Sequence, residues 1–255
     1  MSVELAYFVI YGFIFIVGCC IGSFLNVVIY RVPAEISIAR GRSFCPRCKA
    51  PIAAKDNIPL ISWLWLRGKC RHCGGAIPIR YFLVELAGGI AAVWVAVHYR
   101  LGWLSLTGFA ITAILITIAV IDWDEMIIPN GLVIALAIPV MIGFFLYPTP
   151  DLVSRLVGIA LGALPLLTLT LAMGAFGMGD VKLMAVAGFL LGWQGTLLAL
   201  FLGILFGGGV GVVKLLRKTG EKEMAFGPYL CMGIFIAMLY SSDIIGLYLS
   251  AFGLG

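Results

Sequence analysis

Long apolar runs dominate the sequence and are separated by shorter polar stretches. A helix of about 20 apolar residues is long enough to cross the hydrocarbon core of a bilayer. The run at 183–216 is too long for one crossing, and Gly192-Trp193-Gln194-Gly195 within it predicts a tight turn between two helices. We therefore predict an all-α polytopic membrane protein with about eight transmembrane helices, at 5–30, 81–98, 102–121, 127–147, 153–174, two within 183–216, and 226–249.

The stretch 31–80 is the only extended polar segment, and it divides the chain into three predicted parts. Residues 1–30 would form the first transmembrane helix, 31–80 a cytoplasmic metal-binding domain, and 81–255 a seven-helix membrane domain. A cleavable signal peptide is the alternative for the first helix. It is disfavoured because the N-terminus lacks the positive charge of such signals and the apolar run continues past Cys19.

Composition excludes several protein classes. Hydrophobic residues make up 62% of the chain and charged residues 11%, against about 45–50% and about 25% in soluble domains. The mean hydropathy is +1.12. These values exclude soluble globular, disordered and collagen-like proteins.

Positive charge is concentrated in the polar segment. Residues 31–80 contain ten Lys/Arg and two acids, a net charge of +8. Because Lys and Arg are enriched in cytoplasmic loops, we expect this segment in the cytoplasm and the N-terminus outside. Fifteen of the seventeen Lys/Arg then lie in cytoplasmic loops. The orientation rule explains the basic segment without invoking nucleic acid, so we expect no nucleic-acid partner.

Four cysteines in the polar segment have the spacing of a metal site. They form C-x2-C-x21-C-x2-C with Cys45, Cys48, Cys70 and Cys73. Two such pairs place four thiolates around a tetrahedral Zn²⁺ and leave no ligand position open, which predicts a structural zinc-ribbon-like site. The metal would hold together a module too small to build its own core. Two disulfides, disfavoured in a reducing cytosol, and unbound thiols are the alternatives.

Two acidic clusters lie at the ends of predicted transmembrane helices. Asp122 and Asp124 are at the end of the third crossing, and Asp180 is at the start of the sixth. Acids here are costly, about 2.5–3.5 kcal/mol at a helix centre on insertion scales, and therefore suggest function. The two crossings between the clusters run out and back, so the topology places both clusters at the same depth on the cytoplasmic side.

Two adjacent carboxylates predict the chemistry of an aspartic protease, because they share a proton and titrate as a pair. The ionised acid takes a proton from water while the protonated one polarises an amide carbonyl. Gly177 and Gly179 would leave the backbone open to an extended substrate strand. In the alternative, Asp122 and Asp124 are solvated interface residues and Asp180 is a helix N-cap.

Three more polar residues are weaker candidates. Lys182 either biases the ionisation of the acids or reaches towards the membrane surface as interfacial lysines do. Glu85 and Asn26 line a cavity or join helices by hydrogen bonds, and the sequence favours the second role.

Short motifs occur in a fixed order along the chain. They are Gly22-Ser23-Phe24-Leu25-Asn26-Val27-Val28, the two C-x2-C pairs, Asn57-Ile58-Pro59-Leu60-Ile61-Ser62-Trp63, Ile121-Asp122-Trp123-Asp124, Gly177-Met178-Gly179-Asp180 and Phe226-Gly227-Pro228-Tyr229. Together they resemble the type IV prepilin peptidases, bifunctional leader peptidases and N-methyltransferases of bacterial membranes. Presenilin-like proteases share the GxGD pattern but lack the four cysteines.

The resemblance implies specific roles and partners. Asp122 and Asp180 would be the catalytic aspartates, with Asp124 as the fallback; Gly177, Gly179 and Lys182 would support the site. The substrates would be type IV prepilins and pseudopilins, cleaved at the cytoplasmic face of the bacterial inner membrane. S-adenosylmethionine would then methylate the new N-terminus, and the sequence identifies no residue that binds it.

Two other classes of function stay open at this point. One is a proton-coupled polytopic transporter that uses the acids as a relay and the cysteine module for docking. The other is a metal-stabilised assembly protein without chemistry.

Overall fold

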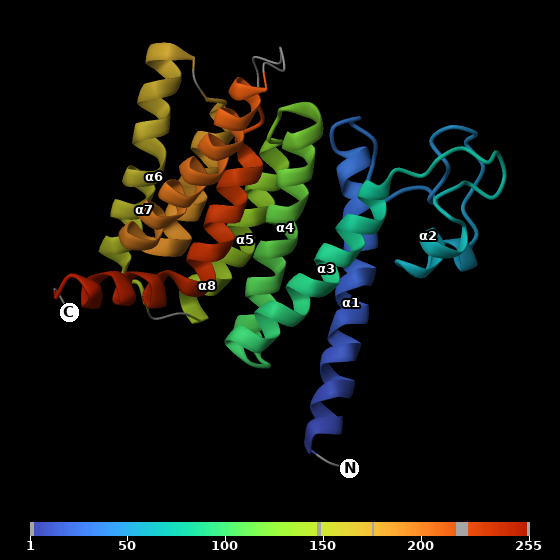
Figure 1. The fold of residues 1–255 in the computed structure, drawn as a ribbon, viewed down its shortest axis with the longest axis horizontal. Coiled ribbons are helices and arrows are strands. Elements are labelled where there is room, and N and C mark those ends of the chain that lie inside the picture. Colours follow the sequence, from blue (N-terminus) through green and yellow to red (C-terminus); the bar gives the residue numbers. More distant parts are fainter. Residues whose placement is uncertain (1–2, 147–148, 175, 218–223, 254–255) are drawn as a thin grey trace. The chain divides into compact units, whose positions relative to one another are not determined.

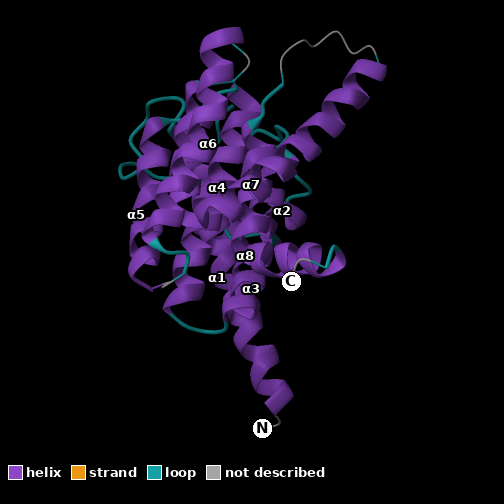
Figure 2. Ribbon diagram, turned by 90° about the vertical axis from the view of Figure 1, so that its left-hand side faces the viewer, coloured by secondary structure: helices purple, strands orange, loops and turns teal. Residues whose placement is uncertain are grey.

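The computed structural model is helical (Figure 1) and describes residues 3–146, 149–174, 176–217 and 224–253. These residues contain no strand (Figure 2), only the isolated bridges Phe44–Pro51 and Lys69–Ala76. The chain divides into two compact units, Met1–Ser105 and Leu106–Gly255.

The first unit contains two long helices with the polar module between them in sequence. These are α1 (Val3–Arg31) and α3 (Ile79–Tyr99), and the module contains η1 (Ala54–Asp56) and α2 (Ile61–Trp65). The helices α1 and α3 pack closely because glycines face each other. A Cβ at Gly18 would lie 2.5 Å from the Gly88 carbonyl oxygen, and one at Gly22 would lie 2.8 Å from the Val84 carbonyl oxygen. Small residues at such interfaces allow backbones to approach closely in membranes.

A buried arginine organises the start of the module. Arg31, in the last turn of α1, is 4% exposed. Its guanidinium donates to the carbonyl oxygens of Ser37 at 2.9 Å, Arg40 at 2.7 Å and Arg42 at 3.2 Å. One side chain therefore satisfies several loop carbonyls and fixes the path of the chain out of α1.

The second unit is a helical membrane domain. It contains most of α4 (Trp103–Glu125), followed by α5 (Asn130–Leu146), α6 (Leu152–Met173), α7 (Met178–Leu216) and α8 (Gly227–Ala251). At the end of α4, Met126 has φ 53, a left-handed conformation that stops the helix directly after the first acidic cluster.

The long helix α7 reverses direction at Gly192, where φ is 68 and ψ is 178. Phe176, just before α7, packs against Phe226 with ring centroids 4.9 Å apart. A Cβ at Gly207, fifteen residues beyond the break, would lie 2.9 Å from the same Phe226 ring. The start of the first arm and the second arm of α7 therefore lie beside the same residue, so the chain doubles back at Gly192. This confirms the predicted turn.

The turn of α7 is held by Arg155 of α6, which is 1% exposed. Its guanidinium donates to the carbonyl oxygens of Phe189 at 2.9 Å, Leu190 at 3.3 Å and Pro150 at 2.8 Å. Phe189 and Leu190 lie at the end of the first arm, whose last carbonyls have no partner within the helix. The arginine supplies the missing donors.

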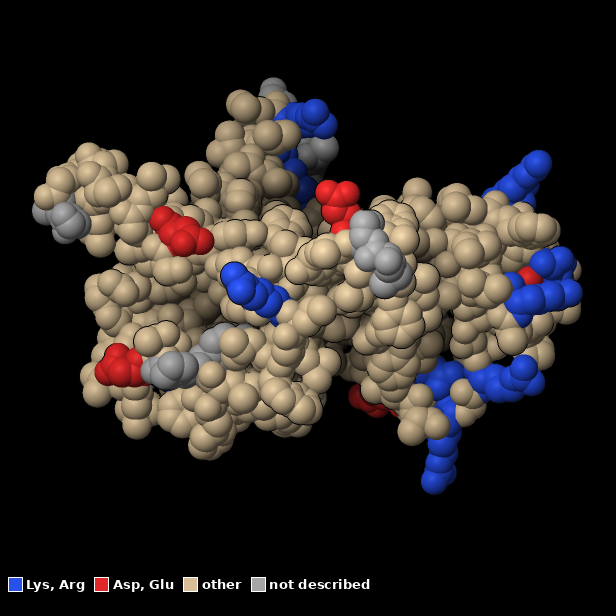
Figure 3. Space-filling view, turned by 90° about the horizontal axis from the view of Figure 1, so that it is seen from below, with Lys and Arg blue, Asp and Glu red and all other residues tan. Residues whose placement is uncertain are grey.

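Within the described residues, six helices are long and apolar enough to cross a membrane, and α7 is one of them. The shorter α5 is also apolar, and counting the two arms of α7 separately gives the predicted eight segments. Large apolar side chains point outward from these helices, such as Phe8 at 78% and Phe145 at 79% exposure. Figure 3, seen from below the view of Figure 1, shows few Lys, Arg, Asp or Glu side chains on that face. Apolar side chains that point outward from the helices suit lipid, and the protein is a multi-pass membrane protein. The sixth segment begins at Met178, five residues before the predicted start.

Candidate active site and metal centre

Asp122 is held at the end of α4 by a residue far away in sequence. Its side chain is 6% exposed. The carboxylate oxygen Oδ2 accepts a hydrogen bond of 2.9 Å from the backbone N–H of Gly227, the first residue of α8. This N–H has no partner within its own helix, since it belongs to the first turn. Burial and this bond fix the position of the carboxylate.

Asp180 occupies the third position of α7 and is 7% exposed. Its oxygen Oδ2 accepts a 3.1 Å hydrogen bond from the N–H of Gly177, just before the helix. The side chain thus reaches back as the acid of a capping box does, so it is not the N-cap that the alternative interpretation expected. Its other oxygen, Oδ1, is buried without a hydrogen-bond partner among the described residues.

Asp122 and Asp180 line one cavity of about 330 Å³ and are close enough to interact electrostatically. The ends of α4 and α7 and the segment before α8 form its walls. The lining residues are Asp122, Met126, Ile127, Ile128, Phe176, Gly177, Met178, Gly179, Asp180, Met224, Ala225 and Phe226. Two buried carboxylates in one open cavity can exchange protons with a bound molecule.

The other predicted site residues fall in different places. Gly177 and Gly179 line the cavity, and a Cβ at Gly179 would lie 2.7 Å from Ile128 Cβ, so this glycine also permits close packing. Asp124 is exposed and does not line the cavity. Lys182 is exposed too, and its ammonium donates to Asn130 Oδ1 at 2.9 Å.

Sequence reasoning assigned no role to Gly227, although its motif was recognised. A Cβ at this position would lie 2.6 Å from Asp122 Oδ2. Only glycine lets the N–H approach the carboxylate so closely. The glycine in Phe226-Gly227-Pro228-Tyr229 was the available indication, but its partner is 105 residues away.

We expect Gly227→Ala to lower the kcat of the leader cleavage that the family resemblance implies about 100-fold, because the new methyl group would displace the Asp122 carboxylate. Gly246→Ala on the same helix is the matched control, since a Cβ there would have no neighbour within 4 Å. Rates of this expected reaction and melting temperatures of both variants check the prediction. Wild-type kcat in Gly227→Ala would show that the contact does not position Asp122.

The four predicted metal ligands lie together in the module. The Sγ atoms of Cys45, Cys48, Cys70 and Cys73 are all within 4.8 Å of one another. A tetrahedral site with Zn–S bonds near 2.3 Å needs sulfur atoms about 3.8 Å apart. The cluster therefore fits a zinc ion after small adjustments.

The two cysteine pairs sit in equivalent turns. Cys45 N–H donates to Ala50 O at 2.9 Å, and Cys70 N–H donates to Gly75 O at 2.8 Å. The backbone N–H groups of Cys73 and His72 lower the pKa of the Cys70 thiol to about 6. Metal ions bind the thiolate form of cysteine, so these backbone N–H groups favour Cys70 as a metal ligand.

An ion pair links the second turn to η1. The Arg71 guanidinium donates two hydrogen bonds to the Asp56 carboxylate, of 2.8 Å from Nε and 2.6 Å from Nη2. The Arg71 side chain lowers the pKa of Asp56 below its usual range. Two-pronged pairing of this kind fixes geometry as well as charge.

Fold and site together define a polytopic α-helical membrane protein with a buried aspartate pair and a cluster of four cysteines that could hold a metal ion. Comparison with known proteins agrees. The family profile "Bacterial Peptidase A24 N-terminal domain" matches residues 16–99, and "Type IV leader peptidase family" matches 109–212. The chain belongs to the type IV leader peptidase family, as the resemblance predicted.

Several curated relatives match over nearly their whole length. The "Prepilin leader peptidase/N-methyltransferase" of Aeromonas salmonicida (strain A449) is 36% identical over 94% of both chains. The proteins of the same name from Pseudomonas aeruginosa (strain PAO1) and Bacillus subtilis (strain 168) are 35% and 33% identical. They cover 93% and 92% of this chain, and the matches span 93% and 96% of the relatives. No solved structure is a significant match.

Proposed function

We propose that the protein is a membrane aspartic endopeptidase that removes the leader of type IV prepilins and pseudopilins and then methylates the new N-terminus. The observation that carries the proposal is the shared cavity of Asp122 and Asp180, two buried carboxylates from helices far apart in sequence. The names of the curated relatives support both activities. These names do not favour the alternative function, a proton-coupled transporter.

Hydrolysis needs a base and an acid, and the two aspartates supply both. The ionised carboxylate takes a proton from a water molecule, whose oxygen adds to the carbonyl carbon of the scissile peptide. The protonated carboxylate donates to the carbonyl oxygen. Collapse of the tetrahedral intermediate breaks the C–N bond, and the leaving amine takes up a proton. Asp180 Oδ1 is suited to carry this proton, because no group among the described residues is hydrogen-bonded to this oxygen.

The rim of the cavity suits the substrate. Met126 and Ile127 are 53% and 49% exposed, and Gly177 leaves backbone uncovered. The apolar side chains match the hydrophobic helix of a pilin, and the glycine lets an extended strand approach. The scissile bond lies just before that helix, at the membrane boundary.

The proposed protein would bind two groups that are not part of the chain, a zinc ion and S-adenosylmethionine. Zinc on Cys45, Cys48, Cys70 and Cys73 would hold the module together and leave no position for catalysis. S-adenosylmethionine, when bound, supplies the methyl group that a pilin amine receives as the amine loses a proton. We place the protein in the bacterial inner membrane with its N-terminus outside and the module and aspartates in the cytoplasm, as the distribution of Lys and Arg favours.

Mass spectrometry of a prepilin incubated with detergent-solubilised protein and S-adenosylmethionine tests both activities together. We expect loss of the leader and gain of one methyl group on the new N-terminus. An intact prepilin would contradict the peptidase assignment, and cleavage without methylation would contradict the second activity alone. Proton-coupled uptake by proteoliposomes, without cleavage, would favour the transporter instead.

A further inference from the structure

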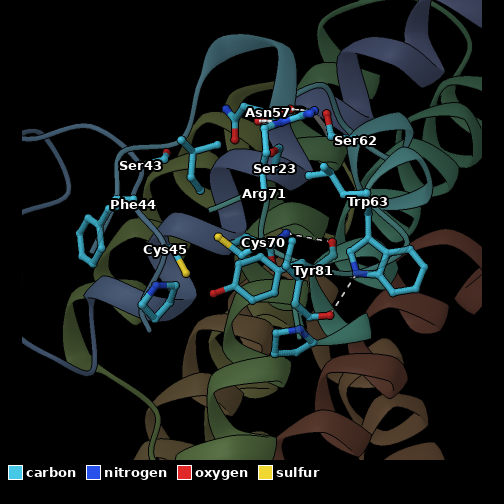
Figure 4. A pocket seen from close by; sticks show the side chains of 18 of the residues that line it. Ser23, Ser43, Phe44, Cys45, Asn57, Ser62, Trp63, Cys70, Arg71 and Tyr81 are labelled. Carbon is cyan, nitrogen blue, oxygen red and sulfur yellow. Dashed lines mark hydrogen bonds and ion pairs between the residues drawn. The ribbon is translucent and has the colours of Figure 1, made fainter. Parts of the chain in front are cut away.

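The first unit contains a cavity that no step of leader cleavage uses. Its volume is about 460 Å³, larger than that of the aspartate cavity and within the ~300–1,000 Å³ of small-molecule sites. Residues of α1, α3 and the cysteine module line it. Figure 4 shows side chains from all these parts around it, among them Ser23 of α1, Cys45 and Cys70 of the module, Trp63 of α2 and Tyr81 of α3.

A buried acceptor on the wall of this cavity lacks a donor. Asn26 of α1 is 4% exposed, and its Nδ2 donates to the Tyr81 carbonyl oxygen at 3.0 Å. This bond joins α1 to α3, as the sequence suggested. Its Oδ1 is buried and has no hydrogen-bond partner among the described residues. A buried acceptor without a donor is costly, so this atom indicates a ligand that carries an N–H or O–H group.

Groups of both charges also line the cavity. Glu85 of α3 accepts the N–H of Leu60 at 2.7 Å and a hydrogen bond from Ser23. A carboxylate accepts about four hydrogen bonds, so it retains capacity for a ligand. The Arg80 guanidinium lies 5.5 Å from the centre of the Tyr81 ring and also lines the cavity. The walls thus offer an anion, a cation and aromatic surfaces.

We propose that this cavity is the binding site for S-adenosylmethionine. The inference rests on the methyltransferase half of the proposed function and assigns it to residues of the first unit. The donor carries a sulfonium and an ammonium, which match Glu85, and a carboxylate, which matches Arg80. Its adenine and ribose carry N–H and O–H groups that can donate the hydrogen bond missing at Asn26 Oδ1. Aromatic side chains such as Trp63 and Tyr81 can pack against the flat purine ring.

The location can be tested without measuring activity. The full chain in detergent is irradiated with S-adenosylmethionine labelled in its methyl group, and the labelled peptides are identified by mass spectrometry. We expect the label in residues 23–85, with competition by S-adenosylhomocysteine. Label confined to residues 106–255 would overturn the proposal and leave the methyltransferase function intact. If the protein bound no donor and methylated no pilin, the proposed function itself would fail.

Two variants test the residues. Glu85→Gln retains an oxygen for the Leu60 N–H but loses the charge, so calorimetry should show S-adenosylhomocysteine binding weakened about 10- to 100-fold. Asn26→Leu should weaken it as well. Glu4→Gln, the same change on the exposed first turn of α1, is the matched control and should bind as the wild type does. Equal melting temperature and zinc content establish that Glu85→Gln is folded; wild-type affinity in this folded variant would overturn the assignment.

Discussion

Asp122→Asn and Asp180→Asn are each expected to lower the rate of leader cleavage by roughly 10²–10⁴-fold, the contribution of a positioned acid or base. Each asparagine retains a side-chain oxygen for its backbone donor, Gly227 N–H or Gly177 N–H. The fold should therefore persist while proton transfer is lost. Rates are measured with a detergent-solubilised variant and a prepilin.

The variant Asp124→Asn tests whether the third acid takes part in cleavage together with Asp122 and Asp180. Asp124 is exposed and lies outside the cavity lining, so we expect near wild-type cleavage from this variant. Melting temperatures close to that of the wild type would show that all three variants are folded. Full activity in Asp180→Asn, or loss of activity only in Asp124→Asn, would show that Asp122 and Asp180 are not the catalytic pair.

Removal of the metal is expected to unfold the cysteine module. Structural zinc contributes about 10–16 kcal/mol of apparent binding free energy in zinc-finger peptides, and the fold around Cys45–Cys73 has no strand to replace it. A strong chelator, or Cys70→Ser, should therefore expose residues 43–77 to protease. Elemental analysis should find one zinc per wild-type chain and little in Cys70→Ser.

The control for this experiment is Cys20→Ser, a change to an exposed cysteine of α1 that does not belong to the cluster. It should retain zinc and protease resistance. Wild-type protein that holds no zinc, or a module that stays protease-resistant after chelation, would refute a structural metal.

Much of the fold followed from apolar runs, since lipid requires long helices with their backbone bonds satisfied internally. The break at Gly192 was predictable because the run around it is too long for one crossing and contains two glycines in four residues. The start of α7 was missed, since Met178 and Gly179 precede a charged residue that interrupts the apolar pattern. In the sequence alone, an acid such as Asp180 in the first turn of a helix looks the same as a polar residue in the preceding loop.

The contacts that complete the site were not predictable. The pairing of Asp122 with Asp180 followed from topology, but the Gly227 N–H that fixes Asp122 depends on the packing of α8. Similarly, Asn26 and Glu85 were expected either to line a cavity or to join helices by hydrogen bonds, and only the structure shows that both residues line the same cavity. Hydrogen bonds between distant segments leave no periodic pattern.

The turn at Gly192 also bears on the lipid around the protein. The first arm of α7, residues 178–191, is about 21 Å long at ~1.5 Å per residue, shorter than the ~30 Å hydrocarbon core. A short hydrophobic element is accommodated by local thinning of the bilayer. We therefore expect the leaflet to thin around Asp180, near the start of this arm, so that bilayers of shorter acyl chains bring water closer to it than thick, sterol-rich ones do.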